Sequence, residues 1–197
     1  IINADNFEYN KITNVIDANG DVKIDNRSEN YLIYTSNATY LKNEELFLTK
    51  GQSKAINEGI IIDADNFEYN KITNVINANG DVKIDNKSEN YLIYTSNATY
   101  LKNEELFLTK GQSKAINEGI IIDADNFEYN KITNVINANG DVKIDNKSEN
   151  YLIYTSNATY LKNEELFLTK GQSQAINEGI IIDADNFEYN KITNIIN

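Results

Sequence analysis

The stretch Ile76-Asn77-Ala78-Asn79-Gly80-Asp81-Val82-Lys83-Ile84 decides the fold of this chain. Small and apolar residues alternate in it with polar ones, and this period of two predicts a strand with one buried face. β-Branched residues and Tyr, which favour strands, dominate the apolar positions. Segments rich in Asn predict turns between such stretches. Together they predict four long strands and almost no helix, with the strands at approximately Ile60–Tyr69, Asn74–Asp85, Tyr91–Tyr100 and Glu105–Ile116.

These strands belong to a 60-residue unit that occurs three times and then begins again. Residues 1–60, 61–120 and 121–180 are near copies, and residues 181–197 start a fourth. The third copy differs from the second only at Gln174, which replaces Lys114. A shift of 31 residues also aligns the unit with itself, so each copy contains two diverged half-repeats. We therefore expect residues 1–197 to form one continuous array of stacked repeats.

A change of face within the strands predicts a crease. Ile62 and Ala64 share one parity, whereas Phe67 and Tyr69 share the other, although all four residue types suit an interior. An extra residue at Asp65 and Asn66 would restore the phase, and this is the signature of a β-bulge.

The neighbouring strands carry glycines that allow them to bend at the same level, Gly80 in one half-repeat and Gly111 in the other. With a turn centred near Lys71 and Ile72, Asp65 and Asn66 would lie opposite Ala78 and Asn77. The same reasoning places Asn97 opposite Leu108. Bends at one level predict two sheets that meet around an apolar interior.

The composition excludes several classes of function. The chain has no Cys and no His, so it lacks disulfides, thiolate metal sites and the commonest general base. Its net charge of −12 disfavours nucleic acid as a partner. The longest apolar run, at residues 59–62, is far too short to span a bilayer. No signal peptide is visible, and we take the chain to be a segment of a longer protein.

The repeated motif resembles the OstA/LptA family of lipopolysaccharide-transport proteins. The similarity lies in Ile-x-Ala-Asp-x-Phe-x-Tyr followed by Ala-Asn-Gly-Asp-Val-Lys-Ile, and it recurs in every copy. The matching residues are Ile62, Ala64, Asp65, Phe67, Tyr69, Asn74, Ala78, Gly80, Val82 and Ile84. The resemblance implies an open β-jellyroll, or β-taco, that holds lipid acyl chains between its sheets. It also implies a periplasmic or cell-envelope location and end-to-end pairing with further copies or with similar domains.

The candidate site is the interior. The residues expected to face it, as a lipid groove or as plain core packing, are Phe67, Tyr69, Ile76, Val82, Ile84, Ile93, Tyr100 and Phe107, with the equivalents Phe127, Tyr129, Ile136, Val142, Ile144, Ile153, Tyr160 and Phe167. The residues expected to form the crease are Asp65, Asn66, Gly80 and Gly111. The sequence predicts no catalytic residue, metal ligand or cofactor. Asp63, Asp65, Asp81 and Asp85 lack calcium-binding spacing, and Glu104 and Glu105 would point to opposite faces of a strand.

Two functions follow from these features. The first is a non-enzymatic periplasmic bridge that binds the acyl chains of lipopolysaccharide, or of another lipid, in the trough between the sheets. The second is a structural filament or spacer that assembles by end-to-end strand addition, which the near-identity of the copies favours. An enzyme is not expected, because no nucleophile–base pair or phosphate-binding loop is present.

Overall fold

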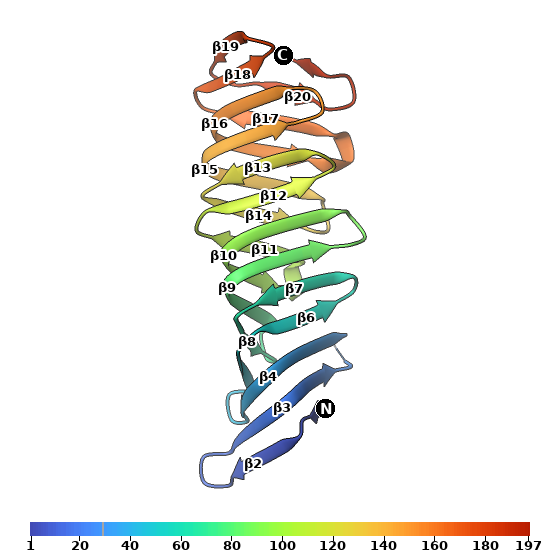
Figure 1. Ribbon diagram of the computed structural model, residues 1–197, viewed down its shortest axis with the longest axis vertical. Coiled ribbons are helices and arrows are strands. Elements are labelled where there is room, and N and C mark those ends of the chain that lie inside the picture. Colours follow the sequence, from blue (N-terminus) through green and yellow to red (C-terminus); the bar gives the residue numbers. More distant parts are fainter. Residues whose placement is uncertain (29) are drawn as a thin grey trace. The chain divides into compact units, whose positions relative to one another are not determined.

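The chain folds into bent antiparallel strands connected by short turns (Figure 1). The computed structural model describes residues 1–28 and 30–197, which divide into two compact units, Ile1–Asn103 and Glu104–Asn197. The strands of the first unit are β1 (Ile2–Asn3), β2 (Asn6–Asn10), β3 (Val15–Asn26), β4 (Tyr31–Leu41), β5 (Leu46–Lys50), β6 (Ser53–Asn57), β7 (Ile60–Ala64), β8 (Asn66–Asn70), β9 (Val75–Asn86) and β10 (Tyr91–Leu101).

The second unit repeats this order of long and short strands. Its strands are β11 (Leu106–Lys110), β12 (Ser113–Asn117), β13 (Ile120–Ala124), β14 (Asn126–Asn130), β15 (Val135–Asn146), β16 (Tyr151–Leu161), β17 (Leu166–Lys170), β18 (Ser173–Asn177), β19 (Ile180–Ala184), β20 (Glu188–Asn190) and β21 (Ile195–Ile196). The helical elements of the described residues are two 3-10 turns, η1 (Lys102–Glu104) and η2 (Lys162–Glu164).

Each long strand takes part in two sheets. In the first unit, one half of β9 pairs with β7 and the other half pairs with β8. The two halves of β4 pair in the same way with β6 and β5. We call the sheet that contains β6 and β7 sheet I, and the sheet that contains β5 and β8 sheet II. In the second unit, sheet I contains β12, β13, β18 and β19, and sheet II contains β11, β14, β17 and β20.

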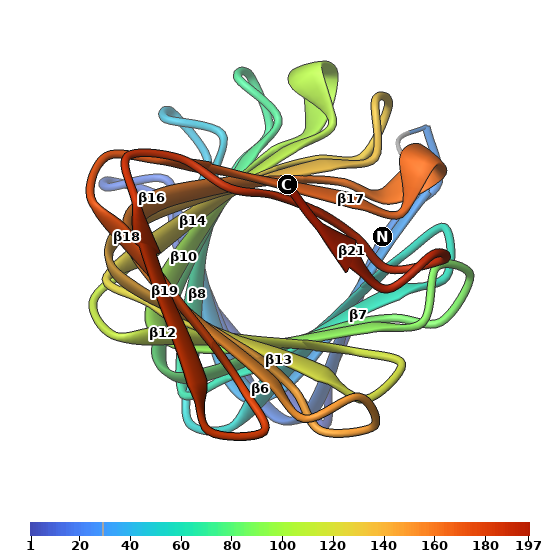
Figure 2. The ribbon, with the colours of Figure 1, turned by 90° about the horizontal axis from the view of Figure 1, so that it is seen from above.

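The two sheets meet at a crease, where β3, β9 and β15 bend and where the short strands are interrupted. The end-on view shows the two layers: in the second unit β12 and β13 lie in one layer, and β14 and β17 lie in the other (Figure 2). Because each long strand crosses from one sheet to the other, the turns that follow these strands lie on the side opposite the crease. We call this side the mouth.

The predicted fold class, an all-β jellyroll of two creased antiparallel sheets, is confirmed. The four strands predicted for a repeat correspond to β7 with β8, β9, β10, and β11 with β12. The small helical content, two 3-10 turns of three residues each, agrees with the expectation of almost no helix. Apolar residues alternate with polar ones along each strand, and the apolar set packs between the sheets.

The predicted register at the crease was wrong by two residues. Asn66 lies opposite Asn79 and not opposite Asn77. In the other half-repeat the same shift occurs. Asn37 pairs with Lys50 and Asn157 pairs with Lys170, whereas the expectation for the equivalent Asn97 was Leu108, two residues earlier than the matching Lys.

The reason for the shift is the conformation of the turn. The Asn70 side-chain oxygen accepts hydrogen bonds from the backbone N–H groups of Ile72 and Thr73, at 2.9 and 3.0 Å. Asn74 then adopts a left-handed conformation with φ 55°. This Asx-type turn moves the centre of the hairpin one residue toward the C-terminus, and the pairing therefore moves by two.

None of the helical segments in residues 1–28 and 30–197 has the length and apolar character that a membrane crossing requires.

Candidate functional site

The interior between the sheets contains all the side chains predicted to face it. In the first unit these are Phe67, Tyr69, Ile76, Val82, Ile84, Ile93 and Tyr100, and in the second Phe107, Phe127, Tyr129, Ile136, Val142, Ile144, Ile153, Tyr160 and Phe167. Each is between 0 and 2% exposed. The interior is therefore apolar, and in this conformation it is filled by the protein's own side chains.

A row of aromatic rings lines the inner face of sheet II. In the first unit, the rings of Tyr40 and Phe47 stack with centroids 4.2 Å apart, and Phe47 lies 6.1 Å from Tyr69. The second unit repeats the row, with Tyr160 and Phe167 at 4.1 Å and Phe167 and Tyr189 at 5.9 Å. Strand register places these residues side by side on adjacent strands. The row presents a continuous wall of apolar surface to sheet I.

Backbone geometry forms the crease in the first half-repeat. The N–H group of Asp65, between β7 and β8, donates to the carbonyl oxygens of Asn79 and Gly80, at 3.1 and 3.0 Å. Gly80 has φ 75° and Asp81 has φ 42°, so two successive residues lie in the left-handed region. A Cβ atom at Gly80 would lie 2.1 Å from Asp65 Oδ2. The bend therefore requires glycine both for its backbone conformation and for space.

Hydroxyl groups form the crease in the second half-repeat, and sequence reasoning missed them. Ser53 Oγ lies 2.9 Å from Thr35 Oγ1 and 2.8 Å from Thr49 Oγ1, and it donates to the carbonyl oxygen of Gly51 at 2.6 Å. Thr49 Oγ1 accepts the N–H of Phe67 at 2.7 Å. These three hydroxyl residues are buried.

The second unit has the same cluster at Ser173, Thr155 and Thr169, beside Gly171. In the middle of the chain, Ser113 Oγ donates to the carbonyl oxygen of Gly111, whose φ is 90°. A β-bulge displaces a backbone N–H group from its partner in the sheet, so that N–H needs another acceptor. A Thr or Ser on the strand beside the predicted bulge can supply one, and this signal could have identified Thr49 from the sequence.

Side chains close the mouth of the first unit. Asn26, at the end of β3 in sheet I, donates through Nδ2 to the hydroxyl of Tyr69 in sheet II at 2.7 Å. The rings of Tyr31 and Tyr69 lie 5.3 Å apart, and Lys102 Nζ lies 5.0 Å from the Tyr31 ring. Sequence reasoning assigned the Asn to a turn. Its parity, which matches that of Val22 and Ile24, indicates that it faces inward.

The mouth of the second unit has the same Asn–Tyr hydrogen bond and, in addition, a salt-bridge network, which we call the ion bridge. Asn146 Nδ2 donates to the Tyr189 hydroxyl at 2.6 Å, and the Tyr151 hydroxyl donates to the carbonyl oxygen of Asn194 at 3.2 Å. Lys191, in a turn of sheet II, lies 2.8 Å from Glu118 in a turn of sheet I and 3.0 Å from Glu165. Each of these contacts between the two sheets at the mouth thus involves at least one side chain.

The ion bridge shifts the pKa values of Lys191 and Glu118. Burial alone would lower the pKa of Lys191, but hydrogen bonds to Glu118 and Glu165 outweigh it and raise that pKa. The hydrogen bond from Lys191 lowers the pKa of Glu118. In the first unit, Glu45 bonds to Lys71 and to the Tyr40 hydroxyl, which lowers the Glu45 pKa, while burial and this bond raise the pKa of Tyr40. The shifts of Lys191, Glu118, Glu45 and Tyr40 all favour the charge state that each group has at neutral pH.

The interior is lined mainly by apolar side chains, so apolar contacts dominate there. In residues 1–28 and 30–197, no group of three or more His, Cys, Asp or Glu side chains is arranged to hold a metal ion. The buried polar residues are hydroxyls at the crease and amides at the mouth, and they bond to one another and to backbone.

Strand edges with apolar side chains are exposed at β2 and at β19. Ile180 in β19 is 64% exposed, whereas its equivalent Ile120 in β13 is 2% exposed. Phe7 in β2 is 49% exposed, and its equivalent Phe67 is 1% exposed. The equivalents are buried because further strands of the same unit pack against them.

The chain matches no family model and no curated protein. Among solved structures it is similar to LptH, the LptA-homologous periplasmic component of the lipopolysaccharide transport device of Pseudomonas aeruginosa. The two are 16% identical, the match covers 71% of this chain and 80% of LptH, and the TM-score is 0.30. A likeness at this level does not define a function.

Proposed function

We propose that this chain is a non-enzymatic, cell-envelope lipid carrier that binds the acyl chains of lipopolysaccharide between its two sheets. One observation carries the proposal. Along the crease the backbone itself is bonded, as at Asp65, while at the mouth the contacts between the sheets involve side chains such as Asn26 and Tyr69. An apolar interior with one hinged side and one side-chain seam can admit a long apolar ligand without breaking the strand ladder.

Lipid entry requires the mouth to open, because the described interior is filled. Parting the mouth separates Asn146 from Tyr189 and Lys191 from Glu118, and these contacts contribute little each in water. Separating the sheets exposes the aromatic row of sheet II, which costs about 25 cal/mol per Å² of apolar surface. Acyl chains that cover the same surface offset this cost, so the ligand would replace contacts between the sheets.

A structural spacer is the second candidate, and the closed interior favours it. Side chains that are 0 to 2% exposed form an ordinary core. The exposed edges at β2 and β19 would then serve end-to-end addition of further repeats, through backbone hydrogen bonds and the side chains of Phe7 and Ile180. The same edges would extend a lipid trough, so end-to-end addition alone does not separate the two functions.

Site-specific photocrosslinking tests the proposal. A benzophenone amino acid is placed at Phe167, inside sheet II, or as a control at Glu128, which is exposed on the outer face of the same sheet. Purified lipopolysaccharide should crosslink from Phe167 and not from Glu128, and free fatty acid should compete. Far-UV circular dichroism verifies that both variants fold. The absence of an interior crosslink in a folded variant, or equal crosslinking from both positions, would contradict lipid binding and support the spacer.

A further inference from the structure

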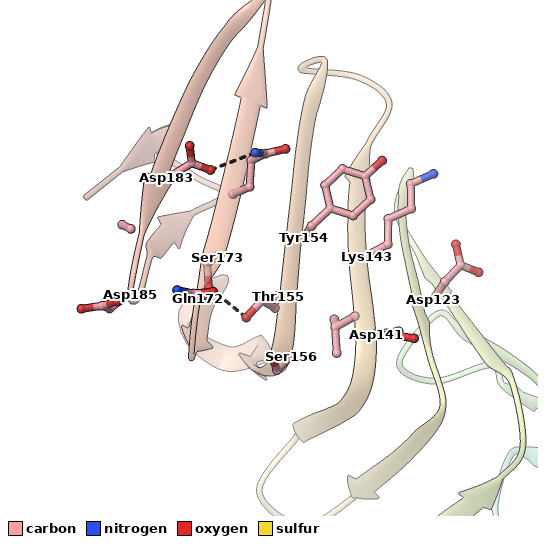
Figure 3. A pocket seen from close by; sticks show the side chains of 13 residues that line it. Asp123, Asp141, Lys143, Tyr154, Thr155, Ser156, Gln172, Ser173, Asp183 and Asp185 are labelled. Atoms are coloured by element: carbon pink, nitrogen blue, oxygen red, sulfur yellow. Dashed lines mark hydrogen bonds between the residues drawn. The ribbon is translucent and has the colours of Figure 1, made fainter.

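The outer face of sheet I has a groove beside the crease, at the same repeat position in each unit. In the second unit the groove has a volume of about 1000 Å³, and its lining includes Lys143, Tyr154, Gln174 and Asp183 (Figure 3). In the first unit the groove has a volume of about 800 Å³. Its lining includes Tyr34, Ser36, Gln52, Lys54 and Asp63, most of which have an equivalent in the other groove.

Strand register places the lining residues of the second groove in one row across sheet I. Lys143 of β15 lies opposite Tyr154 of β16, Tyr154 lies opposite Gln174 of β18, and Gln174 lies opposite Asp183 of β19. Gln174 Nε2 donates to Asp183 Oδ1 at 2.8 Å. In the first unit, Lys54 Nζ lies 3.2 Å from Asp63 Oδ1 at the equivalent place. Each Tyr therefore has a donor and an acceptor at fixed positions beside it.

The Tyr rings of this row are the exposed aromatic surface of the outer face of sheet I, which also carries an apolar row at Leu32, Ile56 and Ile61. Tyr34, Tyr94 and Tyr154 are 39, 41 and 42% exposed. Lys23 Nζ lies over one face of the Tyr34 ring, 5.8 Å from its centre, so a ligand would stack on the opposite face. An exposed ring offers a flat apolar face together with a hydroxyl that stays in water.

The charge around the rings limits the ligand. The groove of the second unit contains Asp123, Asp141, Asp183 and Asp185 against one cation, Lys143. This excess of carboxylates repels phosphate, sulfate and other anions. A ring face flanked by carboxylate, amide and hydroxyl groups instead suits a neutral molecule with many hydroxyls and one apolar C–H face, which is the chemistry of a pyranose sugar.

We propose that these grooves bind a neutral linear polysaccharide. The C–H face of a sugar ring stacks on Tyr34 or Tyr154, and its hydroxyls donate to Asp63 or Asp183. Lys54 and Gln174 donate to sugar oxygens from the neighbouring strand. This function is separate from lipid binding, because the grooves lie on the outer face of sheet I and the acyl chains would lie inside.

The repeat spacing suits a polymer more than a short sugar. In the first unit, one row runs from Tyr34 through Lys54, Asp63 and Lys83 to Tyr94. Adjacent strands lie about 4.8 Å apart, so the two Tyr rings are separated by roughly 19 Å along the sheet. A polysaccharide that contacts both rings gains affinity from the second contact without further ordering of the protein. A sugar too short to reach both gains nothing.

Affinity electrophoresis and calorimetry with neutral glucans test the inference. The protein should be retarded by hydroxyethylcellulose, and cellobiose, which is too short to reach two rings, should bind more weakly per molecule than cellohexaose or the polymer. The triple variant Y34A/Y94A/Y154A should lose at least about tenfold in affinity (about 1.4 kcal/mol), whereas Y34F/Y94F/Y154F should retain it because the ring face is kept. A matched control, I72A/I132A/I192A, changes exposed turn residues and should bind normally.

Direct observation of the rings covers the case in which the alanine variant does not fold. In wild-type protein, cellohexaose should shift the NMR signals of the Tyr34, Tyr94 and Tyr154 rings and leave the buried Tyr129 ring unchanged. Three results would overturn the inference. They are failure of neutral glucans to retard the wild-type protein, equal binding by a folded alanine variant, and tighter binding of dextran sulfate or spermine than of the neutral polymer.

Discussion

The crease and the mouth enclose the same interior by different means. In the first half-repeat the crease depends on backbone conformation, because Gly80 lies in the left-handed region and Asp65 N–H bonds to backbone carbonyls. In the second half-repeat, buried hydroxyls such as that of Ser53 are added to the bend. The mouth depends on side chains, as in the bond from Asn26 to Tyr69. The backbone dihedral angles at the bend are fixed by the residues there. The side-chain contacts at the mouth can break and form again without a change in strand pairing. One side is therefore suited to act as a hinge and the other as an opening.

The largest expected effect comes from filling the crease. Gly140→Ala places a Cβ atom 2.1 Å from Asp125 Oδ2 at a backbone φ of 75°. We expect the free energy of unfolding of the second unit to fall by about 3 kcal/mol, measured by urea denaturation. The matched control is Gly119→Ala, at φ 86° but with no atom within 4 Å of the new Cβ. It should cost about 1 kcal/mol. Equal losses in both variants would show that the crease has no special demand for space.

Removal of a crease hydroxyl should have the next largest effect. Thr109→Val removes the acceptor of the Phe127 N–H, now 2.7 Å from Thr109 Oγ1, and leaves that N–H buried. The expected loss of stability is about 2 kcal/mol. Thr133→Val, an exposed turn residue, is the control and should change stability by less than about 0.5 kcal/mol. A neutral Thr109→Val would mean that another acceptor is available at the bulge.

Weakening the mouth should affect access more than stability. Tyr189→Phe removes the hydroxyl that bonds to Asn146 and keeps the ring in the aromatic row. We expect a loss of about 1 kcal/mol and an increase in binding of a hydrophobic dye or of lipopolysaccharide. Tyr154→Phe, on the outer face, should change neither. If dye binding in Tyr189→Phe stays at the wild-type level, the mouth is not the route to the interior.

The smallest effect should be the pH dependence of the mouth. The pKa of Glu118 is lowered in the folded state, so its contribution to stability is present above its unfolded pKa and is lost as pH falls through the folded value. The pKa of Lys191 is raised, so its contribution is lost only as pH rises through that higher value. Dye binding should therefore increase in acid below about pH 4.5 and in strong alkali. Glu118→Gln should remove its part of the acid response, and an unchanged acid profile would exclude this bridge.

The sequence was informative about the crease and less informative about the mouth, for a physical reason. Strand parity and Gly80 are local, so the bend could be inferred from neighbouring residues. The contact between Asn146 and Tyr189 joins two strands far apart in the chain, and it depends on the register of every strand between them. The Asx-type turn at Asn70 shifted that register by two residues, which period and composition alone do not reveal.

Identical residues also differ in burial according to what lies beside them. Phe7 is exposed and Phe67 is buried, although the two occur in the same motif. The sequence of a repeat therefore predicts which side chains can be buried, but the neighbouring strands decide which of them are. The predicted interior set lies in the parts of each unit where strands are present on both sides.

The pairing of every strand with its near neighbours in the sequence has a consequence for folding. Even the most widely separated pairs, such as Ile60 with Asn86, lie within a single repeat length. Loops that close over such short distances form quickly, so each unit should fold by adding one hairpin after another. The same near-identity creates a hazard, because a hairpin from one copy offers the same side chains as the corresponding hairpin of the next. A chain that slips by a whole repeat during folding would meet no local mismatch to reverse the error.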